Sequence, residues 1–148
     1  MSQVLSAPHV LEFPYTRSTG PVVGRFLAGL KDQRILGIRG SDGRVLVPAQ
    51  EYDPQTSQTL APEAMVDVGT EGEVTTWSWN PKPRDGQPLD RPFAWALVLL
   101  DGADTPLLHA VDVAGPEQMH TSMRVRARWA DERIGRIQDL ACFEPTEA

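Results

Sequence analysis

The fold is decided by an almost uninterrupted apolar stretch of the sequence, Phe93-Ala94-Trp95-Ala96-Leu97-Val98-Leu99-Leu100. Pro92 stands before it and Asp101-Gly102 follows it, so turn-forming residues bound the stretch at both ends. A short apolar run without alternation is typical of a β-strand that is covered on both faces. The sequence therefore predicts a β-structure with this strand at its centre.

Further strands are predicted on both sides of this stretch. Met65–Asn80 ends in an alternating pattern, and Glu71-Gly72 inside it indicates a bend of the kind that a barrel corner needs. A short helix or irregular connection at Gly115–Thr121 interrupts the later strand-like segments, which are Thr105–Val113, Met123–Trp129 and Ile134–Phe143. Three strands, a short connecting element and two strands is the order of the OB-fold, a five-stranded barrel. We therefore expect a mainly β protein with an OB-fold barrel over residues 63–148.

The N-terminal part is predicted to hold an arm, a helix and a hairpin. Residues 1–19 form the arm, and residues 20–62 contain the helix and the hairpin. Pro21 suits a first helical turn, and an apolar stripe at spacings of three and four follows it, consisting of Val22, Val23, Phe26, Leu27 and Leu30. This stripe indicates a packing or docking helix. The hairpin has the strands Arg34–Arg39 and Val45–Pro48 around the turn Ser41-Asp42-Gly43.

Composition limits the possible functions. The chain has 148 residues and a formal net charge of −6, which disfavours binding to nucleic acid. Cys142 is the only cysteine, so neither an intramolecular disulfide nor a cysteine-rich zinc site can form. The residues Met1–Val10 do not resemble a signal peptide, and no apolar stretch approaches the roughly 20 residues that span a bilayer. We expect a soluble, cytoplasmic protein.

Two side-chain groups are candidates for ligand binding. Arg124, Arg126 and Arg128 alternate with apolar residues, so they share one face of a strand. They form either a phosphate-binding stripe, for nucleic acid or coenzyme A, or a solvated face paired with nearby carboxylates, which we favour. The aromatic side chains form either a base-stacking platform or the filling of a small barrel, which we again favour; they are Trp77, Trp79, Phe93 and Trp95.

No catalytic constellation is recognisable in the sequence. His109 and Asp112 are three residues apart in a predicted strand, a spacing that places them on opposite faces. Cys142 stands in an apolar strand, where cysteine is usually inert. We therefore expect no catalytic residue, no metal and no cofactor, and a binding function rather than an enzymatic one.

The order of these parts resembles the zinc-ribbon plus OB-fold family known as domain of unknown function thirty-five. The resemblance covers roughly residues 14–145. It is carried by four stretches together, which are residues 24–30 (Gly-Arg-Phe-Leu-Ala-Gly-Leu), 43–48 (Gly-Arg-Val-Leu-Val-Pro), 92–101 and 123–129.

The resemblance implies a zinc ribbon with two CxxC pairs, but the cysteines are missing here. Alignment on Gly43-Arg44 places the first pair at Arg39 and Asp42, and alignment on Pro54 places the second at Asp53 and Thr56. Because tetrahedral zinc needs four thiolate or imidazole-like ligands, we predict a degenerate ribbon without metal.

The resemblance also implies a function. Members of the family bind thiolase-like or lipid-transfer-type enzymes, including steroid side-chain aldolases, and act there as scaffolds for acyl-CoA chemistry. For this chain it implies a non-catalytic subunit of a hetero-oligomer that docks onto such a partner. The helix of residues 20–32 and the arm before it are the candidate docking surfaces, with Phe26, Leu27 and Leu30 as candidate docking residues. It also makes acyl-CoA a candidate ligand of Arg124, Arg126 and Arg128. The alternatives are an OB-fold nucleic-acid module and an enzyme that uses Asp112, His109 or Arg128.

Overall fold

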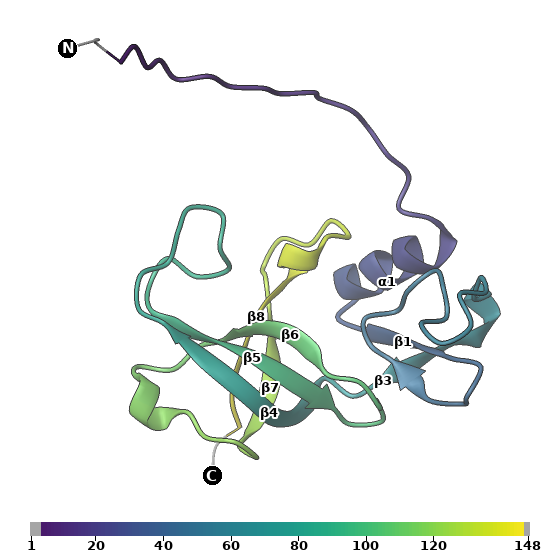
Figure 1. The fold of residues 1–148 in the computed structure, drawn as a ribbon. Helices are drawn as coiled ribbons and strands as arrows, with labels where there is room; N and C mark the ends of the chain where they lie inside the picture. The colour runs from purple at the N-terminus through teal and green to yellow at the C-terminus, as the bar shows by residue number, and fades with distance from the viewer. Residues whose placement is uncertain (1–3, 147–148) are drawn as a thin grey trace.

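The computed structural model describes residues 4–146, which form a closed β-barrel beside a smaller sheet with one helix (Figure 1). The regular elements, in chain order, are α1 (Pro21–Lys31), β1 (Ile35–Arg39), β2 (Val45–Leu46), the 3-10 turn η1 (Pro62–Ala64), β3 (Met65–Val68), β4 (Glu71–Asn80), β5 (Phe93–Leu100), β6 (Leu107–Val111), η2 (Pro116–Gln118), β7 (Arg124–Trp129), η3 (Ile137–Asp139) and β8 (Leu140–Pro145).

The barrel has the strand order β4-β5-β6-β8-β7 and closes by pairing β4 with β7. All pairs are antiparallel except β6 with β8, which meet in parallel at Val111 and Phe143. This is the OB-fold order, so the predicted fold class is confirmed. Gly72 sits where β4 pairs with both neighbours, and a Cβ there would lie 2.4 Å from the Leu99 carbonyl oxygen. A glycine therefore lets the first barrel strand bend at this point.

The central strand β5 is apolar on both faces because both faces are covered. Ala94, Ala96, Val98 and Leu100 point into the main core. Phe93 belongs to a second small cluster with Cys142, against which Trp95 packs. The rings of Phe93 and Trp95 meet edge to face with centroids 5.0 Å apart. The two-sided burial predicted for this stretch is thus explained by the core on one side and this outer cluster on the other.

Two segments differ from the sequence-based expectation. Met65–Val68 does not enter the barrel but pairs with β1, giving a separate sheet of order β2-β1-β3. The barrel strands therefore begin at Glu71. Residues 134–139 are not a strand, because the buried carboxylate of Asp139 accepts the backbone N–H groups of Ile134, Gly135 and Arg136. A carboxylate that binds three successive amides curls the chain into a loop.

The helix α1 packs on the small sheet and is joined to the barrel. Its first turn is held by Glu51, whose Oε1 accepts the N–H groups of Val22 and Val23, both at 2.9 Å. The β5–β6 turn holds β2, since Asp104 Oδ2 accepts the Val45 N–H at 2.8 Å. One continuous core cluster includes residues of both sheets, so the two parts form one packed body.

The arm that precedes α1 makes no such contacts. It leaves the body at the N-terminal end of the helix and extends away from it (Figure 1). Its described apolar side chains are largely exposed, from 72% for Leu11 to 89% for Leu5. No helix in the described range 4–146 is long and apolar enough to cross a membrane.

Candidate functional site

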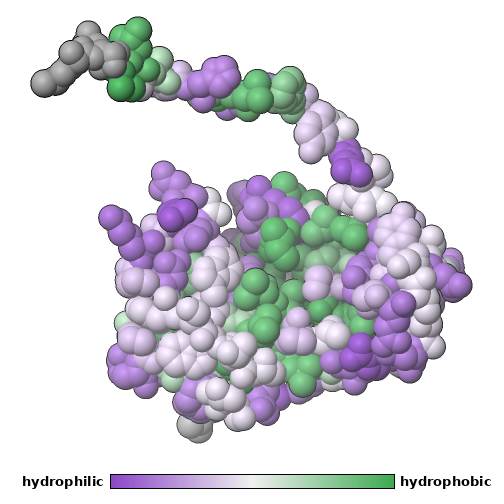
Figure 2. Space-filling model, in the orientation of Figure 1, coloured by the Kyte–Doolittle hydropathy of each residue, from purple (hydrophilic) through white to green (hydrophobic). Residues whose placement is uncertain are grey.

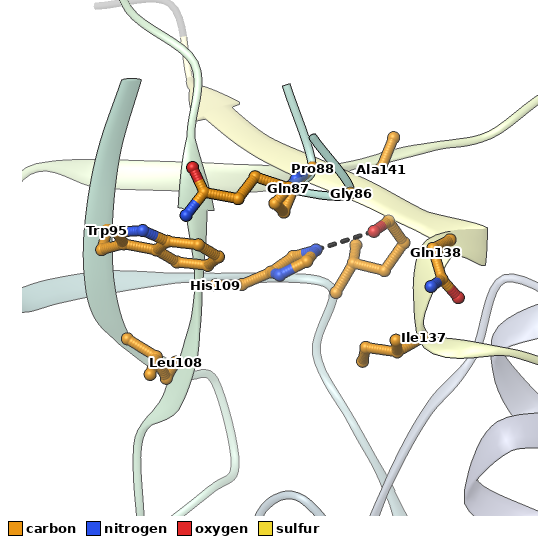
Figure 3. A pocket seen from close by; sticks show the side chains of 10 residues that line it. Gly86, Gln87, Pro88, Trp95, Leu108, His109, Ile137, Gln138 and Ala141 are labelled. Atoms are coloured by element: carbon orange, nitrogen blue, oxygen red, sulfur yellow. Dashed lines mark hydrogen bonds between the residues drawn. The ribbon is translucent and has the colours of Figure 1, made fainter. Parts of the chain in front are cut away.

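An apolar hollow of about 420 Å³ opens on the outer face of β5 and β6. Its walls come from the loop of residues 81–92, from β5, β6 and β8, and from the turn η3. Trp95 and Leu108 line one side, and Ile137 lines the other (Figure 3). In the space-filling view, apolar side chains gather in the middle of this face (Figure 2). Such a hollow can take an apolar group but offers few polar atoms to orient a ligand.

His109 lies at the floor of the hollow and has a structural bond. Its Nε2–H donates to the Leu140 carbonyl oxygen at 2.7 Å, and the residue is 6% exposed (Figure 3). Burial lowers the pKa of His109, which favours the neutral imidazole. The bond joins β6 to β8, whose ladder is otherwise paired only at Val111 and Phe143. This junction of β6 and β8 is the seam of the barrel, and the bond from His109 helps to close it.

Asp112 faces a different set of groups. Its carboxylate pairs with the guanidinium groups of Arg91 and Arg128, with Arg128 Nη2 at 2.7 Å from Oδ2. His109 and Asp112 therefore have separate partners, as the spacing argument predicts. Together with Arg128 they do not form the acid–base arrangement that the enzymatic alternative requires. Cys142 is buried, and burial raises the pKa of its thiol to about 11, so it stays protonated near neutral pH.

The three arginines of β7 are engaged by carboxylates of β8 and of the segments that directly follow β5 and β6. Arg124 makes a two-bond contact with Asp101, with nitrogen–oxygen distances of 2.8 and 2.6 Å. Arg126 donates to Glu144 at 3.0 Å, and Arg128 bridges Glu144 and Asp112. This geometry matches the paired-face interpretation. A phosphate ligand on this face would have to displace these carboxylates, so phosphate or coenzyme A binding by the stripe stays a prediction.

Two of the three candidate docking side chains lie in the core. Phe26 is 4% exposed and Leu30 is fully buried, because the apolar stripe of α1 faces the chain's own small sheet. Leu27 is half-buried against the same core. In this conformation Phe26 and Leu30 are not on the surface and cannot contact a partner, contrary to the expectation that they are docking residues. The hollow is the feature that the sequence-based analysis missed. The exposed arm, which that analysis named as a candidate docking surface, carries the alternating residues Leu11, Phe13 and Tyr15.

The aromatic residues do not form an exposed platform. Trp77 and Trp79 are half-buried and pack against the main core, whereas Phe93 is fully buried. Only Trp95 lines the hollow. Because stacking of bases needs exposed rings beside free cations, this arrangement and the paired arginines disfavour the nucleic-acid alternative.

The side chains at the aligned zinc positions do not form a donor set for zinc. Arg39 is a cation, and its Nη1–H donates to the Gly43 carbonyl oxygen at 2.8 Å. Asp42, Asp53 and Thr56 supply only oxygen atoms, whereas structural zinc in ribbons takes sulfur or imidazole nitrogen. Among residues 4–146, no cluster of three or more histidine, cysteine or acidic side chains could hold a metal ion.

Comparisons with known proteins agree with this architecture. Residues 65–130 match the family model described as the C-terminal OB-fold domain of ChsH2. A crystal structure of a DUF35-family protein of unknown function from Sulfolobus solfataricus is 22% identical, with a TM-score of 0.56 over 74% of this chain and 78% of that one. A chain of the structure described as the Ltp2-ChsH2(DUF35) aldolase is 18% identical, with a TM-score of 0.59 over 82% of this chain and 91% of that one. No curated protein matches significantly. The resemblance stated from the sequence is thus confirmed: residues 65–130 are similar to the C-terminal OB-fold domain of ChsH2, and the chain shares its fold with the two DUF35-family structures.

Proposed function

We propose that this chain is a non-catalytic, cytoplasmic scaffold subunit that docks onto a lipid-transfer-type or other thiolase-like aldolase. The observation that carries the proposal is the likeness to a chain of the Ltp2-ChsH2(DUF35) aldolase, which extends over 91% of that chain and includes the region before the barrel. The family model for the ChsH2 OB-fold domain supports the same assignment. In this proposal the partner supplies the chemistry, on acyl-CoA substrates of lipid or steroid metabolism.

The arm is the surface that we assign to docking. Its exposed apolar residues include Leu11, Phe13 and Tyr15, at 72%, 73% and 81% exposure. They alternate along the chain, so in an extended conformation they share one face. An extended segment with one apolar face can add to the edge of a sheet in a partner, where backbone hydrogen bonds give affinity and alternate side chains fill pockets. A segment of this kind loses conformational entropy when it becomes ordered on binding. The free energy gained by burying its apolar side chains offsets that loss.

Affinity purification of the tagged chain from its native cells tests the proposal. We expect co-purification, at a fixed ratio, of a thiolase-like protein that cleaves or condenses acyl-CoA esters, while the isolated chain turns over none. Purification without such an enzyme, or turnover by the chain alone, would refute the function.

A pair of variants tests the docking surface separately. Leu11→Glu combined with Phe13→Glu is expected to release the partner without changing the unfolding midpoint, because both residues lie outside the packed body. The control is Leu108→Glu, which places one such charge on a 58% exposed residue of the hollow. Release by the control alone would move the docking surface from the arm to the hollow.

A further inference from the structure

The two turns at which the family resemblance implies zinc ligands contact each other in this chain. The first turn is closed by the Gly43 N–H, which donates to the Gly40 carbonyl at 3.0 Å. The second is closed by the Ser57 N–H, which donates to the Asp53 carbonyl at 2.8 Å, within a loop flanked by a bridge between Tyr52 and Thr59. Neither turn has a strand ladder to hold it against the other. Something other than the backbone must therefore join them.

The Asp53 carboxylate lies at the junction of the two turns. Its Oδ2 accepts the Ser41 N–H of the first turn at 2.7 Å. Its Oδ1 accepts the N–H groups of Gln55 and Thr56 in the second turn, at 2.8 and 3.1 Å. Asp53 is 3% exposed, although no cation lies among these contacts. Backbone N–H donors lower the pKa of Asp53, so the carboxylate is ionised at neutral pH.

The surroundings of Asp53 fit this role. A Cβ on Gly40 would lie 3.2 Å from Asp53 Oδ2, so the absence of a side chain at Gly40 lets the carboxylate approach the first turn. Asp42 adds a second, more exposed link, since its Oδ2 accepts from Gln55 Nε2 at 2.8 Å. The contacts between the turns are therefore made by ionised oxygens with amide donors, which are stronger than neutral hydrogen bonds.

We infer that the Asp53 carboxylate replaces zinc as the cross-link of the ribbon, so that this chain keeps the ribbon geometry without a metal. A zinc ion joins two turns through four thiolates, one pair from each turn. Here one anion from the second turn binds backbone N–H groups of both. The geometry that a metal would impose is thus imposed by hydrogen bonds to a single side chain. This inference does not depend on the proposed docking function.

Hydrogen–deuterium exchange on the full chain tests the cross-link. Asp53→Asn keeps the shape but replaces one acceptor oxygen by an NH₂ group that faces a donor. We expect exchange in residues 40–44 and 53–58 to accelerate about tenfold or more, with residues 93–111 of the barrel unchanged. The matched control Asp42→Asn, in the same pair of turns but 30% exposed at its side chain, is expected to change exchange much less. Equal effects of the two variants, or none from Asp53→Asn, would overturn the inference.

A second variant keeps the test decisive if Asp53→Asn does not fold. Ser41→Pro removes the N–H that reaches Asp53 Oδ2, together with the Ser41 hydroxyl that also bonds to Asp53, at a turn position that proline suits. It is expected to accelerate exchange in both turns, and unchanged exchange in residues 53–58 would contradict the cross-link.

Metal binding gives an independent readout. The purified chain is expected to contain no stoichiometric zinc and to keep its unfolding midpoint in EDTA. The fourfold variant Arg39→Cys, Asp42→Cys, Asp53→Cys and Thr56→Cys, refolded with Co²⁺, is expected to bind one ion with a tetrahedral thiolate spectrum. Stoichiometric zinc in the natural chain would refute the replacement, and a fourfold variant without a cobalt spectrum would refute the shared geometry.

Discussion

The neutral His109 at the barrel seam makes stability depend on pH in a defined window. Burial lowers the pKa of His109 in the folded chain, while in the unfolded chain it titrates near its ordinary value of about 6.5. Below that value the unfolded chain binds a proton that the folded chain does not. The free energy of unfolding is therefore highest above pH 6.5 and falls as the pH drops, until the folded pKa is reached.

The size of this effect is limited by linkage. A single proton changes the free energy of unfolding by at most about 1.4 kcal/mol per pH unit, so the loss between pH 6.5 and 5.0 is at most about 2 kcal/mol. Carboxylates such as Asp67 and Asp101, whose pKa is lowered by arginine partners, lose their contribution only below their ordinary pKa of about 4. Measurements above pH 5 therefore isolate the histidine.

Urea denaturation at pH 7.5, 6.0 and 5.0 measures the effect. The wild-type chain is expected to lose stability over this series. His109→Gln, whose amide N–H can still reach the Leu140 carbonyl, is expected to lose markedly less. His120→Gln, at an exposed position outside the barrel strands, serves as the control and should behave like wild type. Equal pH slopes for wild type and His109→Gln, or a stability that rises toward pH 5, would refute the assignment of His109 as a buried neutral group.

Two further substitutions test the packing of the barrel and the role of its surface charges. Gly72→Ala brings a Cβ within 2.4 Å of the Leu99 carbonyl oxygen and 2.8 Å of the Leu100 Cα, so we expect a loss of about 3 kcal/mol in urea titrations. A midpoint equal to wild type would show that β4 and β5 are not as close as described. Arg126→Ala removes an exposed pair with Glu144 and is expected to leave the thermal midpoint unchanged, because such pairs contribute little. A large shift in differential scanning fluorimetry would mean that the arginine row stabilises the barrel.

The parts of the fold that could be predicted from the sequence are those whose signal is local. β5 is an unbroken apolar run bounded by turn residues, and the alternation of β7 places its arginines on one face, so both strands follow from the local sequence pattern. The pairing of β3 does not, because Met65–Val68 shows the same alternation whether it pairs with β1 or enters the barrel. The segment of residues 134–139 was wrongly predicted as a strand. Nothing local shows that Asp139 binds the amides of its own loop.

The candidate site was less predictable because the residues that contact one another in it are far apart in the sequence. The apolar stripe of α1 indicates a face that is covered, but periodicity does not say whether the cover is the chain's own sheet or another protein. In the structure, Phe26 and Leu30 pack on the chain's own sheet. Likewise, the pairing of Arg124 with Asp101 and of Arg126 with Glu144 joins residues 23 and 18 positions apart. The hollow draws its walls from several separate segments, none of which carries a motif.

The distribution of acidic groups bears on what this chain offers a partner. The net charge of −6 suggests an acidic surface, yet several carboxylates bind backbone N–H groups of the chain itself. Glu51 holds the start of α1, Asp53 the two turns, Asp104 the strand β2 and Asp139 the loop before β8. Acids engaged in this way support the chain's own backbone and are not free for recognition, and the arginines of β7 are likewise paired. Both these carboxylates and these arginines are therefore less able to recognise a partner by charge. The exposed apolar residues of the arm are then the group of described side chains best suited to bind a partner, and the arm is where substitutions should separate docking from folding.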